Sequence, residues 1–272
     1  MTDGLIYEAP DGTFQESNLE YLEQITINTG GNNVNLSKVN KFGYNADIDT
    51  GTSPEIIASF GGSFDPSVNV ISTAQTFTIT YNNTTDGSTS TGARMLLISY
   101  IDEAFASVTA YHTLGSTGSD VTAFTGVGIN RAVVVVFGGE IYNVNDIDLT
   151  ATTDATIQAR IPALKSVTQQ CIYHTPINRT LKLNFINISA LKVSGGGGVP
   201  VVNIVGYSYS RVTGGRYAIF DTELDTSVEN NLIIPLSDPI VFTGREVVYF
   251  EASTDVNNTK LSVRFSGDEI DS

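Results

Sequence analysis

The sequence predicts an all-β protein of antiparallel β-sandwich or jelly-roll domains, with a short N-terminal arm. Three observations lead to this fold class. The chain is rich in Gly, Asn, Thr, Ser and Val, which favour short strands and tight turns. Few segments carry apolar residues at helical spacing. From about residue 25 onward, strand-like segments are separated by turn residues, a pattern typical of sandwiches rather than of βαβ units.

The strand-like segments show which side chains face inward. Three of them alternate apolar and polar residues, as a strand with one buried face does. They are 76–81, 202–211 and 260–265. In 181–188 the alternation changes phase between Phe185 and Ile186. This change predicts a β-bulge, in which one extra residue redirects the side chains that follow.

Two segments, 95–98 and 132–137, are apolar without alternation. Continuous apolar strands are normally covered on both faces. Because the sequence offers almost no helices, we expect the second cover to be another sheet, another domain or another subunit. A contact within the chain and a contact between subunits both remain open.

Composition divides the 272 residues into three parts. Residues 1–40 are weakly patterned and predict an arm, with a short helix beginning at a capping box from Ser17 to Glu20. Residues 41–163 predict a β-sandwich domain, and residues 164–272 predict a jelly-roll-like sandwich. The glycines at 195–198 predict a loop in this last domain, because the lysine and hydroxyl of a phosphate-binding loop do not follow them.

Charge and cysteine content exclude several classes of partner. The chain has 29 acidic and 14 basic residues, a net charge of −15, so we expect no nucleic acid partner. It has no apolar run long enough to cross a bilayer and no signal-peptide pattern, so we expect neither a membrane partner nor classical secretion. A single cysteine, Cys171, rules out an internal disulfide framework and a cysteine-built zinc site.

The candidates for catalysis are few. The imidazoles are His112 and His174, and a pairing of Cys171 with His174 is disfavoured because residues three apart on a strand face opposite ways. The acidic segments 47–51 and 145–148 favour ordinary turns over cation sites. Paired carboxylates remain open, although the chain has no Trp for a sugar cleft. We expect no enzyme, no metal and no cofactor.

Two groups of residues resemble a known family. The first runs through Asn45, Asp47, Asp49 and Gly51 to Glu55 and then Phe-Gly-Gly-Ser-Phe at 60–64. The second is Ser-Thr-Gly-Ala-Arg at 90–94, followed by the apolar strand that ends at 101–102. With a further match at 172–181, they are similar to the pattern of a group of tailed-phage virion structural proteins. The resemblance covers about residues 42–190, and Ser90 stands where that group has Gly.

The resemblance implies a non-enzymatic virion structural protein that assembles in multiple copies. It would be a capsid decoration or cement protein, or a component of the tail, and therefore located in the virion. Its partners would be other virion proteins and further copies of itself, as a homotrimer or another homo-oligomer. The expected interface residues are Leu5, Ile6 and Tyr7 in the arm and Arg94, Leu96 and Ile98 at the apolar strand.

The alternative function is a receptor-binding module of a phage tail that recognises carbohydrate, because fold class alone does not separate the two. Exposed aromatic side chains would then contact the sugar. The tyrosines expected to do so are Tyr207, Tyr209 and Tyr217.

Overall fold

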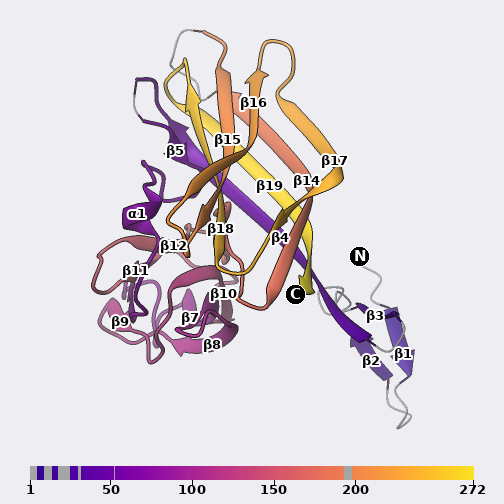
Figure 1. The fold of residues 1–272 in the computed structure, drawn as a ribbon. Coiled ribbons are helices and arrows are strands. Elements are labelled where there is room, and N and C mark those ends of the chain that lie inside the picture. Colours follow the sequence, from indigo (N-terminus) through magenta and orange to yellow (C-terminus); the bar gives the residue numbers. More distant parts are fainter. Residues whose placement is uncertain (1–4, 9–13, 18–24, 30–31, 52, 193–197) are drawn as a thin grey trace.

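A computed structural model describes the chain except for residues 1–4, 9–13, 18–24, 30–31, 52 and 193–197. The described part is nearly all β, in antiparallel sheets with one short helix, which confirms the predicted all-β class. Figure 1 shows a group of long strands, a group of shorter strands below it, and the N-terminal strands to one side.

The long strands, here called the large unit, form two antiparallel sheets. The first has the order β17 (Asn231–Phe242), β14 (Arg179–Lys192), β19 (Thr259–Asp271), β4 (Asn32–Ile48) and β3 (Ile25–Thr29). The second has the order β13 (Ile172–His174), β18 (Glu246–Thr254), β15 (Val201–Ser210) and β16 (Arg216–Asp225), and β5 (Glu55–Ile56) also pairs with β18.

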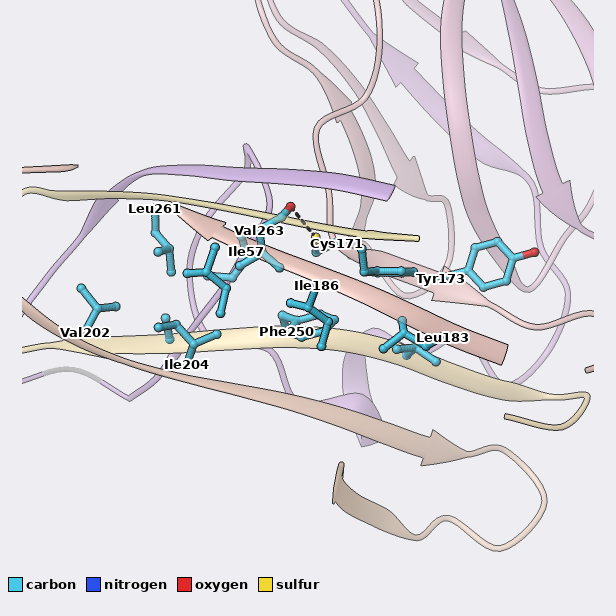
Figure 2. Packing of buried hydrophobic residues seen from close by; sticks show 14 of the residues in the cluster. Ile57, Cys171, Tyr173, Leu183, Ile186, Val202, Ile204, Phe250, Leu261 and Val263 are labelled. Carbon is cyan, nitrogen blue, oxygen red and sulfur yellow. Dashed lines mark hydrogen bonds between the residues drawn. The ribbon is translucent and has the colours of Figure 1, made fainter. Parts of the chain in front are cut away.

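The core of the large unit lies between these two sheets. Ile186 of β14 and Val263 of β19 come from the first sheet, and Ile204 of β15 and Phe250 of β18 from the second; all four are fully buried in one hydrophobic cluster (Figure 2). Strand β14 carries the predicted bulge, because its pairing with β17 and β19 shifts between Leu183 and Phe185. The extra residue lets side chains on both sides of the shift reach the same core.

The shorter strands, here called the small unit, have a separate core. Every residue of its buried cluster lies between Ile71 and Ile161. One sheet has the order β10 (Gly128–Phe137), β7 (Ala93–Ile101) and β8 (Ser107–Thr113). The other has the order β12 (Ile157–Ile161), β11 (Ile147–Ala151), β6 (Phe77–Thr80) and β9 (Ser119–Val121).

The predicted boundary at residue 163 follows the last cluster residue of the small unit, but the boundary at residue 41 falls inside β4. Val39 and Ile48 of this strand both lie in the core of the large unit. Residue 41 is therefore not a break between packed units, because β4 pairs with β19 from Leu36 to Ile48. A single strand continues from the arm into the core.

The arm consists of strands in the described residues. β1 (Leu5–Glu8) pairs with β2 (Phe14–Ser17), and β3 pairs with the first residues of β4, away from the body (Figure 1). Ser17 ends β2, and the rest of the predicted helix lies outside the described residues. The helix that the structure does contain is α1 (Pro66–Asn69), where Asp65 caps the N-terminus by accepting from the Ser67 amide at 2.9 Å.

Within the chain, 95–98 and 132–137 are covered on one face only, so the expected second cover is not supplied by another part of the described chain. Leu96 and Ile98 in β7 are fully buried, whereas Met95 and Leu97 between them are only half-buried. In β10, Val135 and Val136 are exposed. Both strands thus have one core face and one accessible apolar face, because the second sheet of the small unit covers a single side.

Candidate functional site

The accessible side of the sheet β10-β7-β8 is an apolar surface. The strand register places Val133, Leu97 and Tyr111 in one row across the sheet and Val136 beside Met95 in the next. Tyr111 is 70% exposed and Val136 42% exposed, and the other three are half-buried. We call these five residues the outer face. Apolar surface that is contiguous and exposed marks a site of interaction.

The outer face carries no acidic residue, although the chain has 29 of them. The polar side chains that share this side of the three strands are Ser99, Ser107, Thr109, Thr113 and Arg131. A strongly acidic protein repels its own copies and other acidic proteins across most of its surface. This sheet surface adds no carboxylate to that repulsion.

The structure places two of the predicted interface residues in the core. Leu96 and Ile98 are fully buried within the small unit, so they cannot touch a neighbouring subunit in this fold. Met95 and Leu97 lie on the opposite side of β7, which a neighbouring subunit can contact. Ser99 lies on the same side of β7 as Leu97. Its polar side chain is the feature of the sequence that indicates that this side is accessible.

The remaining predicted interface residues lie elsewhere. Arg94 is at the start of β7, and its Nε donates to the carbonyl oxygen of Ser90 at 2.9 Å, so it holds the preceding loop. Leu5, Ile6 and Tyr7 all lie in β1, which pairs with β2.

The first group of residues that carries the family resemblance forms a corner around Glu55. Its carboxylate accepts from the side chain of Asn45 at 3.1 Å, from the amide of Asp49 at 3.1 Å and from the amide of Gly62 at 3.3 Å. The Asn45 side chain in turn accepts from the amide of Asp47 at 3.0 Å. These residues thus connect β4, β5 and the following turn. The Glu55 carboxylate fixes the backbone amides of Asp49 and Gly62 in place.

The second group is organised by Asp86, which is fully buried. Its carboxylate accepts from the amides of Ala93 at 2.8 Å, Val144 at 3.0 Å and Asn145 at 3.0 Å. A Cβ atom at Gly92 would lie 2.3 Å from Asp86 Oδ1, so only glycine fits beside the carboxylate. This corner fixes the start of β7 to the loop before β11.

Two of the three predicted sugar-binding tyrosines lie in a packed aromatic cluster. The guanidinium of Arg216 is 3.7 Å from the ring centre of Tyr207 and donates to Glu251 at 2.5 Å. The ring of Tyr207 stacks on Tyr249 with 5.5 Å between centres. Burial raises the pKa of Glu251, and the charge of Arg216 opposes that shift. Tyr209 packs against the same cluster.

Tyr217 is separated from the other two. It pairs with Ser208 in the register of β15 and β16, so its side chain is on the opposite side of the sheet from Tyr207 and Tyr209. Tyr217 is 58% exposed, and its hydroxyl lies close to Gly215. The three tyrosines therefore do not form one platform.

A buried polar cluster joins the two units. Arg211, in the turn after β15, donates to the carbonyl of Ile71, to the carbonyl of Val127 at 2.7 Å and to His174 Nδ1 at 2.9 Å. The side chain of Asn130 in β10 bonds both the amide and the carbonyl of His174, at 2.8 and 3.0 Å. Burial and the charges around His174 hold its pKa well below the usual value, so the imidazole is neutral.

Cys171 and His174 form no pair. The thiol of Cys171 donates to the carbonyl of Val263 at 2.9 Å, and His174 contacts Arg211 instead. Burial raises the pKa of the Cys171 thiol to about 12, so the thiolate is not formed at neutral pH. The spacing argument from the sequence correctly separated these two side chains.

His112 lies near a carboxylate without a hydrogen bond to it. Its Nε2 is 3.8 Å from Asp120, which accepts from the hydroxyl of Tyr81 at 2.7 Å and from the amide of Gly115 at 2.7 Å. Burial lowers the pKa of His112, and the charge of Asp120 opposes the shift. Because Asp120 is already bonded to these two donors, it serves to close the loop between β8 and β9.

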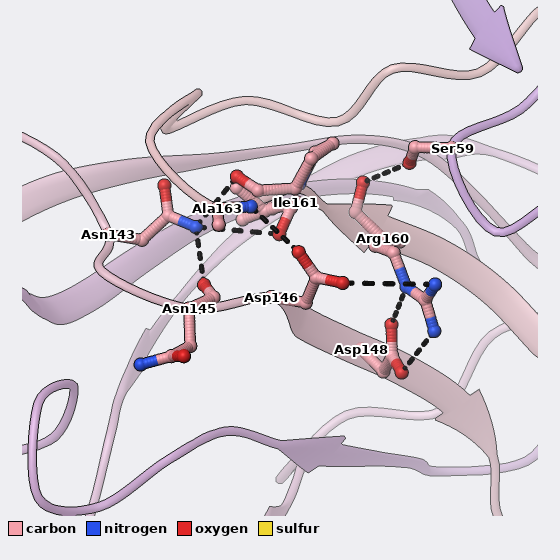
Figure 3. A network of polar contacts seen from close by, with 9 residues as sticks. Ser59, Asn143, Asn145, Asp146, Asp148, Arg160, Ile161 and Ala163 are labelled. Carbon is pink, nitrogen blue, oxygen red and sulfur yellow. Dashed lines mark hydrogen bonds and ion pairs between the residues drawn. The ribbon is translucent and has the colours of Figure 1, made fainter. Parts of the chain in front are cut away.

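The acidic segment 145–148 binds an arginine. Arg160 makes a two-pronged contact with Asp148 at 2.5 and 2.8 Å, and lies 3.9 Å from Asp146 (Figure 3). The Oδ1 of Asp146 accepts from the Ala163 amide at 2.8 Å. In the described part of the chain, no group of three or more His, Cys, Asp or Glu side chains is arranged to hold a metal ion.

Comparison with known proteins gives no family. No family model and no curated protein matches the sequence. Two solved structures of infectious bursal disease virus, of the Gx and Gt strains, align over 87% and 86% of this chain and 76% and 75% of theirs, each at 10% identity. Their TM-scores are 0.18 and 0.14, too low to establish a shared fold.

The described residues include no helix that could span a membrane.

Proposed function

We propose that this chain is a non-enzymatic structural protein of a tailed-phage virion, present in multiple copies as a capsid decoration or cement protein or as a tail component. The observation that carries the proposal is the outer face, an exposed apolar sheet surface without acidic residues on a chain of net charge −15. A surface of this kind is costly to leave in water and suits a neighbouring protein.

The carboxylates in and beside the segments of the resemblance fit the same proposal. Glu55 accepts from two backbone amides and from the side chain of Asn45, and Asp86, which lies before the second segment, accepts from three backbone amides. Both carboxylates thus hold the fold and are not left available for a substrate. Within the same proposal, the paired sheets of each unit form antiparallel sandwiches, of the jelly-roll type in the C-terminal part, a fold class suited to repeated packing in a shell.

The proposal is tested on purified particles of the phage that encodes the chain. Mass spectrometry should find the chain in many copies per particle, and immunogold labelling should place it on the capsid or the tail. Absence from washed particles would refute the proposal.

A Leu97→Glu variant, which puts a charge on the outer face, should remain folded but be lost from particles. The control Val241→Glu places the same charge at an exposed position of β17.

A carbohydrate-recognising receptor-binding module is the second candidate. The observation that favours it is a shallow groove at the ends of β15, β16 and β18, lined by polar side chains that include Asn203, Glu223 and Asp255. A glycan array screened with the wild type and with Glu223→Ala separates the two functions. Reproducible binding that the variant loses supports this candidate, and no binding supports the structural role.

A further inference from the structure

Strand β8 is the last strand of its sheet, and one side of its backbone is unpaired in the described structure. The amide of Leu114 donates to the carbonyl of Arg94, and the amide of Asp102 to the carbonyl of Ala106. In an antiparallel pair, hydrogen-bonded positions alternate along the strand. The backbone groups of Ala110 therefore point toward β7, and those of Thr109 and Tyr111 point away from the sheet.

This free edge has none of the features that normally prevent strands from pairing. β8 contains no proline and no Asp, Glu, Lys or Arg, and its seven residues pair with β7 without a register shift. The edge strand β17 is different, because it contains Pro235, Asp238 and Pro239 and a register shift. Natural edge strands avoid association by such prolines, charges and bulges. β8 is thus an edge open to another strand.

We propose that β8 is the dimer contact of this chain: two copies pair their β8 strands antiparallel about a two-fold axis at Ala110. The proposal rests on the proposed multi-copy function and adds the surface through which copies meet. With the axis at Ala110, all seven residues of each strand are paired, and Thr109 lies opposite Tyr111 of the second copy. About eight hydrogen bonds would form between the copies.

A second copy fits this edge better than a charged partner does. Two chains of net charge −15 repel each other, and β8 with the adjoining outer face is a surface where they can approach without opposing carboxylates. The strand is also complementary to itself, as a two-fold contact requires. Pairing joins the two three-stranded sheets into one, so that Tyr111 of each copy covers Thr109 of the other on a continuous outer face.

The first test uses a disulfide at the axis. Ala110 and its two-fold mate would be a non-hydrogen-bonded pair with Cα atoms about 4.5 Å apart, within the range of a disulfide. Ala110→Cys should therefore form a covalent dimer under mild oxidation, whereas the native Cys171 is fully buried and should not react. The control Val241→Cys, on β17, should stay monomeric. Equal cross-linking of both variants would overturn the proposal.

The second test measures association without a cross-link. Light scattering or sedimentation of the wild type over a range of concentrations should show a monomer–dimer equilibrium. Thr109→Lys, which places a charge at the unpaired edge, should weaken the dimer at least about tenfold, and the control Val241→Lys should not. Circular dichroism of each variant verifies folding. A wild type that is monomeric throughout, or a Thr109→Lys variant that dimerises like the wild type, would overturn the β8 contact.

The particle experiment is independent of these measurements. If purified particles contain the chain but the isolated protein never dimerises, the β8 contact is wrong and the virion function stands. If the chain dimerises through β8 but is absent from particles, the contact stands and the virion function is wrong.

Discussion

Lys41 is a charged residue in an apolar setting. It lies in β4 with 8% of its surface exposed, and its ammonium donates to the carbonyl oxygen of Asn130 in β10. Burial lowers the pKa of Lys41 to about 8 from 10.5; the neighbouring Cys171 opposes this shift and Arg131 adds to it. The large unit thus holds an amine that loses its proton more readily than a lysine side chain in water does.

The lowered pKa predicts how stability depends on pH. Between about pH 8 and 10.5 the unfolded chain binds a proton at Lys41 that the folded chain does not, so the free energy of unfolding rises with pH in this window. The full effect is roughly 3 kcal/mol. Two other groups act in the opposite direction, because burial raises the pKa of Cys171 and of Tyr81 to about 12: Cys171 from about pH 9 upward and Tyr81 from about pH 10 upward. A Lys41 variant keeps both groups, so the effect of Lys41 is the difference between wild type and variant over pH 8–10.

Thermal unfolding of Lys41→Met at several pH values in that range tests this prediction. The melting temperature of the wild type should rise relative to that of Lys41→Met as the pH increases from 8 to 10. Lys165→Met is the control, because Lys165 is exposed and its replacement should leave the dependence of the wild type unchanged. Parallel curves for the wild type and Lys41→Met would contradict the prediction.

Gly92 gives a second prediction at the scale of one residue. In Gly92→Ala the new Cβ would lie 2.3 Å from Asp86 Oδ1 and 2.6 Å from the carbonyl of Thr85, so the corner must shift. We expect a loss of about 1–3 kcal/mol in the free energy of unfolding, measured by denaturant titration. Gly139→Ala meets no atom within 4 Å and should change stability by less than about 0.5 kcal/mol. Equal stability of the two variants would show that the Asp86 corner tolerates a side chain.

The sequence identified several of these residues without their roles. Glu55 and Gly92 belong to the segments that resemble virion proteins, but nothing local indicates that Glu55 binds amides from two other segments. Asp86 and Lys41 were missed because charged residues are mostly exposed, and a buried one is recognised only when its partners are known. Those partners lie far along the chain, as in the contact of Lys41 with Asn130.

At the scale of the element, β7 shows what an apolar run conceals. All of its residues from Met95 to Ile98 are apolar, so the alternation that assigns a strand's inner face is absent there. The pairing with β8 and β10 decides the matter, and it turns Leu96 inward and Leu97 outward. Predicting strand segments was possible from local pattern, whereas the choice of face depended on contacts with distant strands.

The two neighbouring leucines test this orientation. Leu96→Ala removes a fully buried side chain and should cost about 2–5 kcal/mol of stability. Leu97→Ala truncates a half-buried side chain on the outer face and should cost less than about 1.5 kcal/mol in the monomer. Denaturant unfolding at low protein concentration measures both. A larger loss for Leu97→Ala would mean that the faces of β7 are reversed.

At the scale of the whole molecule, the described residues form two units, each with its own core, and a third, smaller hydrophobic cluster that includes Phe64 and Tyr249. The all-β class followed from composition and from the turn-punctuated strand segments. The return of β4 to pair with β19 could not be predicted, because more than two hundred residues separate the partners Leu36 and Ile270. The contact of Arg211 with Ile71 and Val127 is of the same long-range kind.

Arg211 contributes to the coupling that makes the two units unfold together. Its guanidinium is the donor for two carbonyls of the small unit and for His174 of the large unit, and Arg211→Met leaves all three without that donor. A buried acceptor that loses its donor costs about 1–3 kcal/mol. Calorimetry of the wild type should give one transition, and Arg211→Met should give an earlier or separate transition of the small unit. Limited proteolysis of the variant should then cut first within residues 71–161.

Arg264→Met, at an exposed position of β19, should retain the single transition of the wild type. If Arg211→Met also melts as one unit at an unchanged temperature, the coupling must come from the apolar contacts between the units instead.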